Sequence, residues 1–141
     1  MRSLLFAALA MAAALAQASV TASDAWVRGT VAAQKTTGAF VTLQSSEESR
    51  LVAVTTPAAR SAEIHASEQK QGVMHMHALD AIALPAGQRV ELKPGSFHIM
   101  LVGLTRALSA GDTVPLTFTF EDRQGKRTRI EVRAEVRPLG R

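Results

Sequence analysis

The sequence contains no cysteine and no tyrosine, and it has one tryptophan and four histidines among its 141 residues. Without cysteine, these residues can form no disulfide, no zinc–thiolate site, no cysteine nucleophile and no cysteine-linked lipid anchor. A blue-copper electron-transfer site is excluded as well, because it requires a cysteine ligand. Any soft-metal site in this chain therefore has to be built from methionine and histidine.

Aromatic residues are also scarce, at 4% of the chain. Basic residues are frequent near the C-terminus, but they alternate with the acidic residues Glu121, Asp122, Glu131 and Glu135. Proteins that bind single-stranded nucleic acid stack the bases on aromatic side chains, and few are present here. We therefore interpret the basic region as a solvated face of a sheet and expect no nucleic-acid partner.

One long hydrophobic run is present, and it lies at the N-terminus. Residues 4–15 are an unbroken apolar stretch of twelve, preceded by Arg2 and followed by Ala16-Gln17-Ala18. This pattern is typical of a secretory signal peptide, here residues 1–18, with cleavage before Ser19. The run is shorter than the roughly 20 residues that span a bilayer. We expect residues 19–141 to form a single exported domain, without a membrane anchor after cleavage and located in a bacterial periplasm.

The mature chain shows the period-2 alternation and frequent turns of an all-β protein. Apolar and polar residues alternate clearly over 116–120 and 129–137, and turn residues recur about every ten positions. Further strands are expected at 23–28, 36–44, 51–55, 61–65, 73–79, 82–84, 89–92 and 98–101. The connection at 67–72 is polar and predicts a hairpin with a longer loop. Together these patterns favour an antiparallel β-sandwich.

The stretch from Pro94 to Leu101 carries two soft-metal donors where a core strand would be apolar. On a strand, His98 and Met100 share one face, about 6.6 Å apart, while Ile99 and Leu101 share the other and are expected in the core. The Pro94-Gly95 pair predicts a tight turn just before them. The sequence therefore predicts half of a metal site near a strand end.

The remaining donors of the mature chain are His65 and the alternating series from Met74 to His77. Strand geometry places Met74 and Met76 on one face and His75 and His77 on the other. Taken alone, the two methionines are best interpreted as core packing, since methionine commonly fills gaps. Taken alone, His65 is best interpreted as a hydrogen-bonded or exposed histidine.

The spacing of four donors changes these interpretations. His65, Met76, His98 and Met100 form the pattern H-x10-M-x21-H-x-M within 36 residues. This is the signature of the periplasmic copper chaperone family PCu(A)C, which the sequence closely resembles. The likeness extends to the blocks Glu63–His65, Gly72–Met76, Leu84–Gly87, Leu92–Gly95, His98–Leu104 and Gly111–Leu116.

The resemblance implies a cupredoxin-like β-sandwich that binds Cu(I) through His65, Met76, His98 and Met100. Thioether sulfur is a soft donor that favours Cu(I), and imidazole suits copper in either oxidation state. By resemblance, the copper would be delivered for assembly of the copper centre of cytochrome c oxidase. The partners would then be subunit II of that oxidase or a Sco-type thioredoxin-like protein.

Several alternatives stay open at this point. His75 and His77 flank Met76, and we expect them to be exposed, although they and Asp80 are candidates for an auxiliary Cu(II) or zinc site. A dismutase-like enzyme would need a larger cluster of histidines and carboxylates, so we expect a carrier rather than an enzyme. Copper storage or resistance would use the same site with a different partner. A metal-free interaction module would leave the methionines and histidines without a role.

Overall fold

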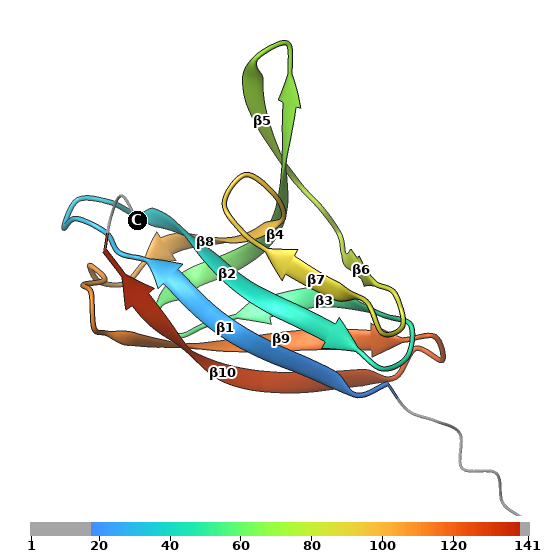
Figure 1. Cartoon of the computed structure of the whole chain (residues 1–141). Helices are drawn as coiled ribbons and strands as arrows, with labels where there is room; N and C mark the ends of the chain where they lie inside the picture. The colour runs from blue at the N-terminus through green and yellow to red at the C-terminus, as the bar shows by residue number, and fades with distance from the viewer. Residues whose placement is uncertain (1–17, 139–141) are drawn as a thin grey trace, which may run out of the picture.

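The computed structural model describes residues 18–138, and all ten of their regular elements are strands (Figure 1). The expected signal peptide falls, except for Ala18, outside the described residues. Within residues 18–138, no helix is long and apolar enough to span a bilayer. The strands are β1 (Val20–Arg28), β2 (Thr36–Ser45), β3 (Ser49–Thr55), β4 (Ala59–Lys70), β5 (Val73–Ala78), β6 (Ile82–Leu84), β7 (Arg89–Leu92), β8 (His98–Leu104), β9 (Thr113–Asp122) and β10 (Arg127–Arg137).

The strands form one hydrogen-bonded path in the order β5-β4-β8-β2-β1-β10-β9-β3-β6, and β7 pairs with β2 beside this path. The path wraps round a single interior, so that β3 comes back close to β4 (Figure 1). The hairpin of β4 and β5 projects from this body (Figure 1). The predicted all-β fold is confirmed, and each strand expected from the sequence is present.

The core is supplied by alternate residues of each strand, as period-2 geometry requires. On β9, Val114, Leu116 and Phe118 are completely buried, and the residues between them are half-buried. On β10, Ala134 and Val136 face the same interior. Full burial of a leucine or phenylalanine side chain contributes about 1.5–3 kcal/mol, so this continuous core is the main stabilising feature of the fold.

One pair of neighbouring strands departs from the predicted antiparallel arrangement. The first strand, β1, pairs with the last, β10, in parallel, with Trp26 opposite Glu135 and Val27 opposite Val136. The other strand pairs among the described residues are antiparallel. Alternation of side chains is the same in both kinds of ladder, so the sequence pattern carries no information about strand direction.

The β4–β5 hairpin is longer and more tightly turned than predicted. Strand β4 continues to Lys70, through the polar residues expected to form a loop, and pairs with β5 as far as Val73. Gln71 and Gly72 make the turn with φ values of 52° and 76°. Positive φ at both central residues is typical of the two-residue turns that match the twist of a hairpin. The prediction of a longer loop was wrong, because polar residues on an exposed hairpin can still form a strand.

We predict that Leu116→Ala lowers the free energy of unfolding by about 2–5 kcal/mol, because it removes a fully buried side chain and leaves a cavity. Urea unfolding of the two proteins measures the difference. The neighbouring Thr117→Ala, whose side chain lies on the other face of β9, serves as the control and is expected to cost less than about 1 kcal/mol. Equal losses in both variants would contradict this placement of the core.

Candidate metal centre

The first half of the site lies at the start of β8, as predicted. His98 is the first residue of the strand and is only 4% exposed, whereas Met100, on the same face, is half-buried. Ile99 and Leu101 point to the other face and are fully buried in the core. One buried imidazole and one partly accessible thioether therefore lie side by side on the outer face of the sheet.

The second imidazole is brought to the site by strand pairing. Strands β4 and β8 are antiparallel neighbours, with His65 directly opposite His98 and Glu63 directly opposite Met100. Directly opposite residues on one face have Cβ atoms about 4.5–5.5 Å apart. The two imidazole rings accordingly lie with their centroids 5.6 Å apart. Two histidines separated by 32 residues in the sequence are thus held against each other by backbone hydrogen bonds.

The predicted turn before β8 is present, and it contacts the hairpin. Gly95 has φ +82°, a conformation that glycine adopts without strain. The turn is closed by the N–H of Ser96, which donates to the carbonyl of Lys93 at 3.0 Å. The carbonyl of Ser96 in turn accepts a hydrogen bond from the N–H of Ser67 at 3.2 Å. This contact holds the loop between β7 and β8 against β4 beside the two histidines.

The hairpin presents Met76 on the same side. Met76 pairs with Ser67, which is two residues beyond His65 on β4 and therefore on the same face. Met74 and Met76 are 50% and 59% exposed, so their interpretation as core packing was wrong. The reason is that β5 lies at the end of the strand path, on a hairpin that projects from the body, so its side chains have no core to pack into. The flanking histidines of β5 are exposed, as predicted.

A small cavity of about 100 Å³ joins three of the predicted residues, Met76, His98 and Met100. The fourth, His65, lies against His98 at its side. The structure thus brings all four predicted residues together; their role as ligands stays a prediction. The other residues that line the cavity are Arg28, Gly38, Phe40, Ser67, Pro94 and Gly95.

Three polar atoms in and beside the cavity have no hydrogen-bond partner. Nδ1 of His65, Nε2 of His98 and Oγ of Ser67 are buried, and none of them has a hydrogen-bond partner. Buried polar atoms are nearly always paired, because leaving one unpaired costs about 1–3 kcal/mol. Two unpaired imidazole nitrogens beside two thioethers form a donor set that suits a soft metal ion such as copper.

An aromatic wall borders the cavity, and the sequence analysis missed its central residue, Phe40. The ring of Phe40 lies 6.5 Å from that of His98 and 4.4 Å from that of Trp26, and the guanidinium of Arg28 lies over the Phe40 ring at 5.6 Å from its centroid. The signal available in the sequence was Gly38, since glycine inside a strand often marks a close approach. A Cβ at Gly38 would lie 2.9 Å from Cζ of Phe40, so the ring covers this position.

The auxiliary site considered for His75, His77 and Asp80 does not form in the structure. Within residues 18–138, no group of three or more histidine, aspartate and glutamate side chains is placed to hold a metal ion. On β5, His75 lies opposite Glu68 and His77 opposite Ala66, and Glu68 is not placed to complete a group of three with the two histidines.

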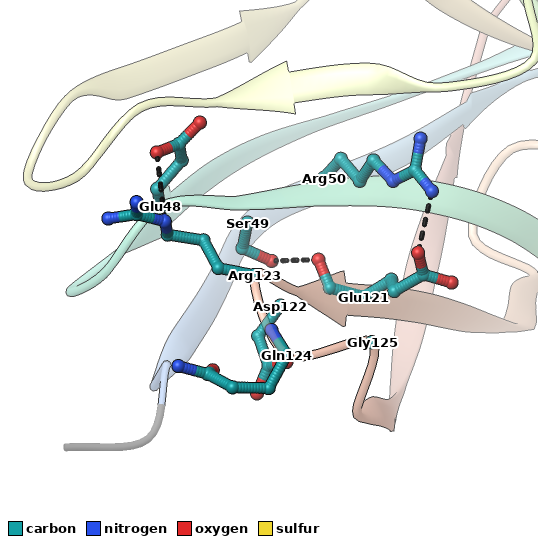
Figure 2. Close-up of a pocket in the computed structure, with 8 residues that line it drawn as sticks. All are labelled: Glu48, Ser49, Arg50, Glu121, Asp122, Arg123, Gln124 and Gly125. Atoms are coloured by element: carbon teal, nitrogen blue, oxygen red, sulfur yellow. Dashed lines mark hydrogen bonds and ion pairs between the residues drawn. The ribbon is translucent and has the colours of Figure 1, made fainter. Parts of the chain in front are cut away.

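Another hollow, of about 440 Å³, lies beside β3 and β9 and contains no soft donors (Figure 2). Four of its charged side chains are paired with one another: Arg50 binds Glu121 at 2.6 Å, and Arg123 lies 3.6 Å from Glu48 (Figure 2). Arg127 adds a second contact to Glu121 at 3.0 Å. The guanidinium of Arg50, and after it that of Arg127, holds the pKa of the Glu121 carboxyl below its usual value. We interpret this hollow as a charged sheet end and not as the metal centre.

Comparison with known proteins identifies the family. A family model described as "Putative lipoprotein LpqE-like" matches residues 20–136. The chain belongs to the LpqE-like family. A putative lipoprotein, Lxx21020 of Leifsonia xyli subsp. xyli, is 35% identical over 106 residues, which are 73% of this chain and 63% of that protein. This LpqE-like chain therefore spans less than two thirds of the length of that relative.

Solved structures show the fold that the LpqE-like chain shares with PCuAC domains. The apo PCuAC domain from PmoF1 superposes with a TM-score of 0.65 at 20% identity, over 84% of this chain and 93% of that domain. The solution structure of CuI-DR1885 from Deinococcus radiodurans superposes with a TM-score of 0.56 at 29% identity, over 91% and 83% of the two chains. These matches show the predicted cupredoxin-like fold, and together with the family model they confirm the resemblance to the PCu(A)C family.

We predict that Glu121 contributes to acid sensitivity. The pKa of Glu121 is lower in the folded than in the unfolded chain, so its ion pairs stabilise the fold fully at pH values above the pKa of the unfolded chain. This stabilisation is lost as the pH falls through the pKa of the folded chain. In Glu121→Gln the midpoint of thermal unfolding should therefore decline less than in the wild type as the pH falls below the reference value of 4.5. Thermal unfolding followed by circular dichroism between pH 6 and pH 3 measures this, and parallel curves would contradict it.

Proposed function

We propose that this protein binds one copper ion through His65, Met76, His98 and Met100. The observation that carries the proposal is the pair of buried imidazole nitrogens without partners, on rings 5.6 Å apart. An imidazole nitrogen binds a first-row metal ion at about 2 Å, so one ion fits between two rings at this separation. The two methionines, which line the adjoining cavity, would complete the set.

The proposed oxidation state is Cu(I). Two thioethers and two neutral imidazoles are soft or borderline donors, and thioethers select Cu(I) over zinc. The set carries no charge of its own, so no thiol has to lose a proton when the ion enters. The 29% identical DR1885 from Deinococcus radiodurans was solved with Cu(I), which supports the same ion here. Oxidation of either methionine to its sulfoxide would weaken the site, because it replaces a soft sulfur by a hard oxygen.

The accessibility of the four residues favours transport over permanent retention. His98 is buried, whereas Met76 is 59% exposed on a projecting hairpin. A ligand of a partner protein could replace Met76 first and the buried imidazoles last. We therefore propose a copper chaperone, which transfers its ion by ligand exchange and catalyses no reaction.

We propose further that the protein acts in the bacterial periplasm and delivers copper for the copper centre of cytochrome c oxidase. The N-terminal apolar run and the relatives described as putative lipoproteins support export from the cytoplasm. The recipient, either subunit II of the oxidase or a Sco-type protein, is proposed from the family resemblance. Copper storage is the second candidate, because it would use the same four residues.

We predict that the mature protein binds one tight equivalent of Cu(I) in an anaerobic titration against a chromophoric chelator, without an intense blue band. The double variant His98→Ala/Met100→Leu should weaken binding by more than about tenfold, because even loss of an outer partner of a ligand costs about 10–100-fold. Met74→Leu is the matched control, since it removes an exposed thioether two residues from Met76 and should bind as the wild type does. Wild-type affinity in the double variant would overturn the proposed site.

Deletion of the gene distinguishes delivery from storage. Under copper limitation, we predict that the deletion strain loses cytochrome c oxidase activity and that added copper restores it. Oxidase activity is measured in membranes, and growth at toxic copper concentrations is measured in parallel. Normal oxidase activity combined with copper sensitivity would favour storage.

A further inference from the structure

The two imidazoles are hydrogen-bonded through different nitrogens. Nδ1 of His98 lies 3.0 Å from the backbone carbonyl oxygen of Ser96. A carbonyl oxygen accepts and never donates, so the neutral ring donates from Nδ1 and has its lone pair on Nε2. Nε2 is the atom of this ring that is buried without a partner.

His65 has the opposite arrangement, and a side chain imposes it. Its Nε2 lies 2.8 Å from Oε2 of Glu63, two residues earlier on the same strand. A carboxylate only accepts hydrogen bonds, so the neutral ring donates from Nε2 and has its lone pair on Nδ1. Nδ1 is again the buried nitrogen without a partner. In each ring, therefore, the free lone pair belongs to the nitrogen that faces no protein acceptor.

We propose that Glu63 is a positioning residue that holds His65 in the Nε2–H tautomer, so that copper is bound through Nδ1 of His65 and Nε2 of His98. This inference rests on the proposed function for its copper step, but the tautomers exist before any metal binds. A hydrogen bond from the second nitrogen of a metal-binding histidine fixes the ring and raises its basicity. Ser96 performs this role for His98 through its backbone, and Glu63 performs it for His65 through its side chain.

The exposed position of Glu63 means that its ion pair with His65 adds little to the stability of the fold. Its side chain is 51% exposed, and exposed ion pairs contribute about 0–1 kcal/mol to stability. It also lies directly opposite Met100, beside the second thioether. Its negative charge therefore lies next to a donor set that has none, where it offsets the charge of a bound monovalent cation.

The tautomers are tested by long-range 1H–15N NMR of the metal-free protein at about pH 8, where imidazole is generally neutral. The proposal predicts the Nε2–H pattern for His65 and the Nδ1–H pattern for His98. In Glu63→Gln, whose amide can both donate and accept, we expect His65 to show a mixture of tautomers. The control is Glu68→Gln, which removes an exposed carboxylate of the same strand and should leave His65 unchanged. An Nδ1–H pattern for His65 in the wild type would overturn the inference.

The same spectra are recorded after anaerobic addition of Cu(I), which is diamagnetic. We expect the resonances of Nδ1 of His65 and Nε2 of His98 to shift, and we expect Cu(I) affinity to fall about 10–100-fold in Glu63→Gln but not in Glu68→Gln. Wild-type affinity and an unchanged tautomer in Glu63→Gln would overturn the role of Glu63. Expected tautomers in a wild-type protein that binds no Cu(I) would instead overturn the proposed function and leave the positioning of His65 standing.

Discussion

The pairing of β4 with β8 is the constraint on which the candidate metal centre depends. In this register His65 lies opposite His98, and the apolar residues Ile64 and Ile99 lie opposite each other in the core. A slip of one residue would turn the imidazole of His65 on β4 into the interior and expose the apolar side chains of that strand. The hydrophobic core therefore fixes the register, and the register fixes the separation of the two rings. The same set of backbone hydrogen bonds therefore determines both the stability of this region and the geometry of the candidate metal centre.

The four predicted ligands become more exposed to solvent from the sheet to the projecting hairpin. His98 is buried in the sheet, His65 and Met100 are half-buried, and Met76 is exposed on the projecting hairpin. The hairpin can move more easily than the sheet, because few apolar contacts hold an exposed edge. A rigid pair of nitrogens and a more mobile sulfur are thus combined in one site, which suits an ion that has to be held and then released.

Much of this arrangement could be predicted from the sequence. Alternation around Ile99 and Leu101 placed His98 and Met100 on one face, and the spacing to His65 and Met76 indicated the family. The hairpin itself was predicted, but its length and its tight turn could not be, because polar residues are compatible with both loops and exposed strands. The parallel pairing of β1 with β10 could not be predicted either, because side chains alternate in the same way in parallel and antiparallel strands. The role of Glu63 requires the distance between two side chains, which a sequence pattern does not contain.

The aromatic wall has a consequence for how the site can be observed. Trp26 is the only indole in the chain, and its ring packs at a tilt against Phe40, which in turn borders His98. A bulge in β1 between Ser23 and Trp26 shifts the register and sets the position of this ring. The emission of a single intrinsic fluorophore is therefore sensitive to changes in the packing of that wall. Binding of the proposed copper ion beside this wall is therefore expected to change the fluorescence of Trp26 in the unlabelled protein.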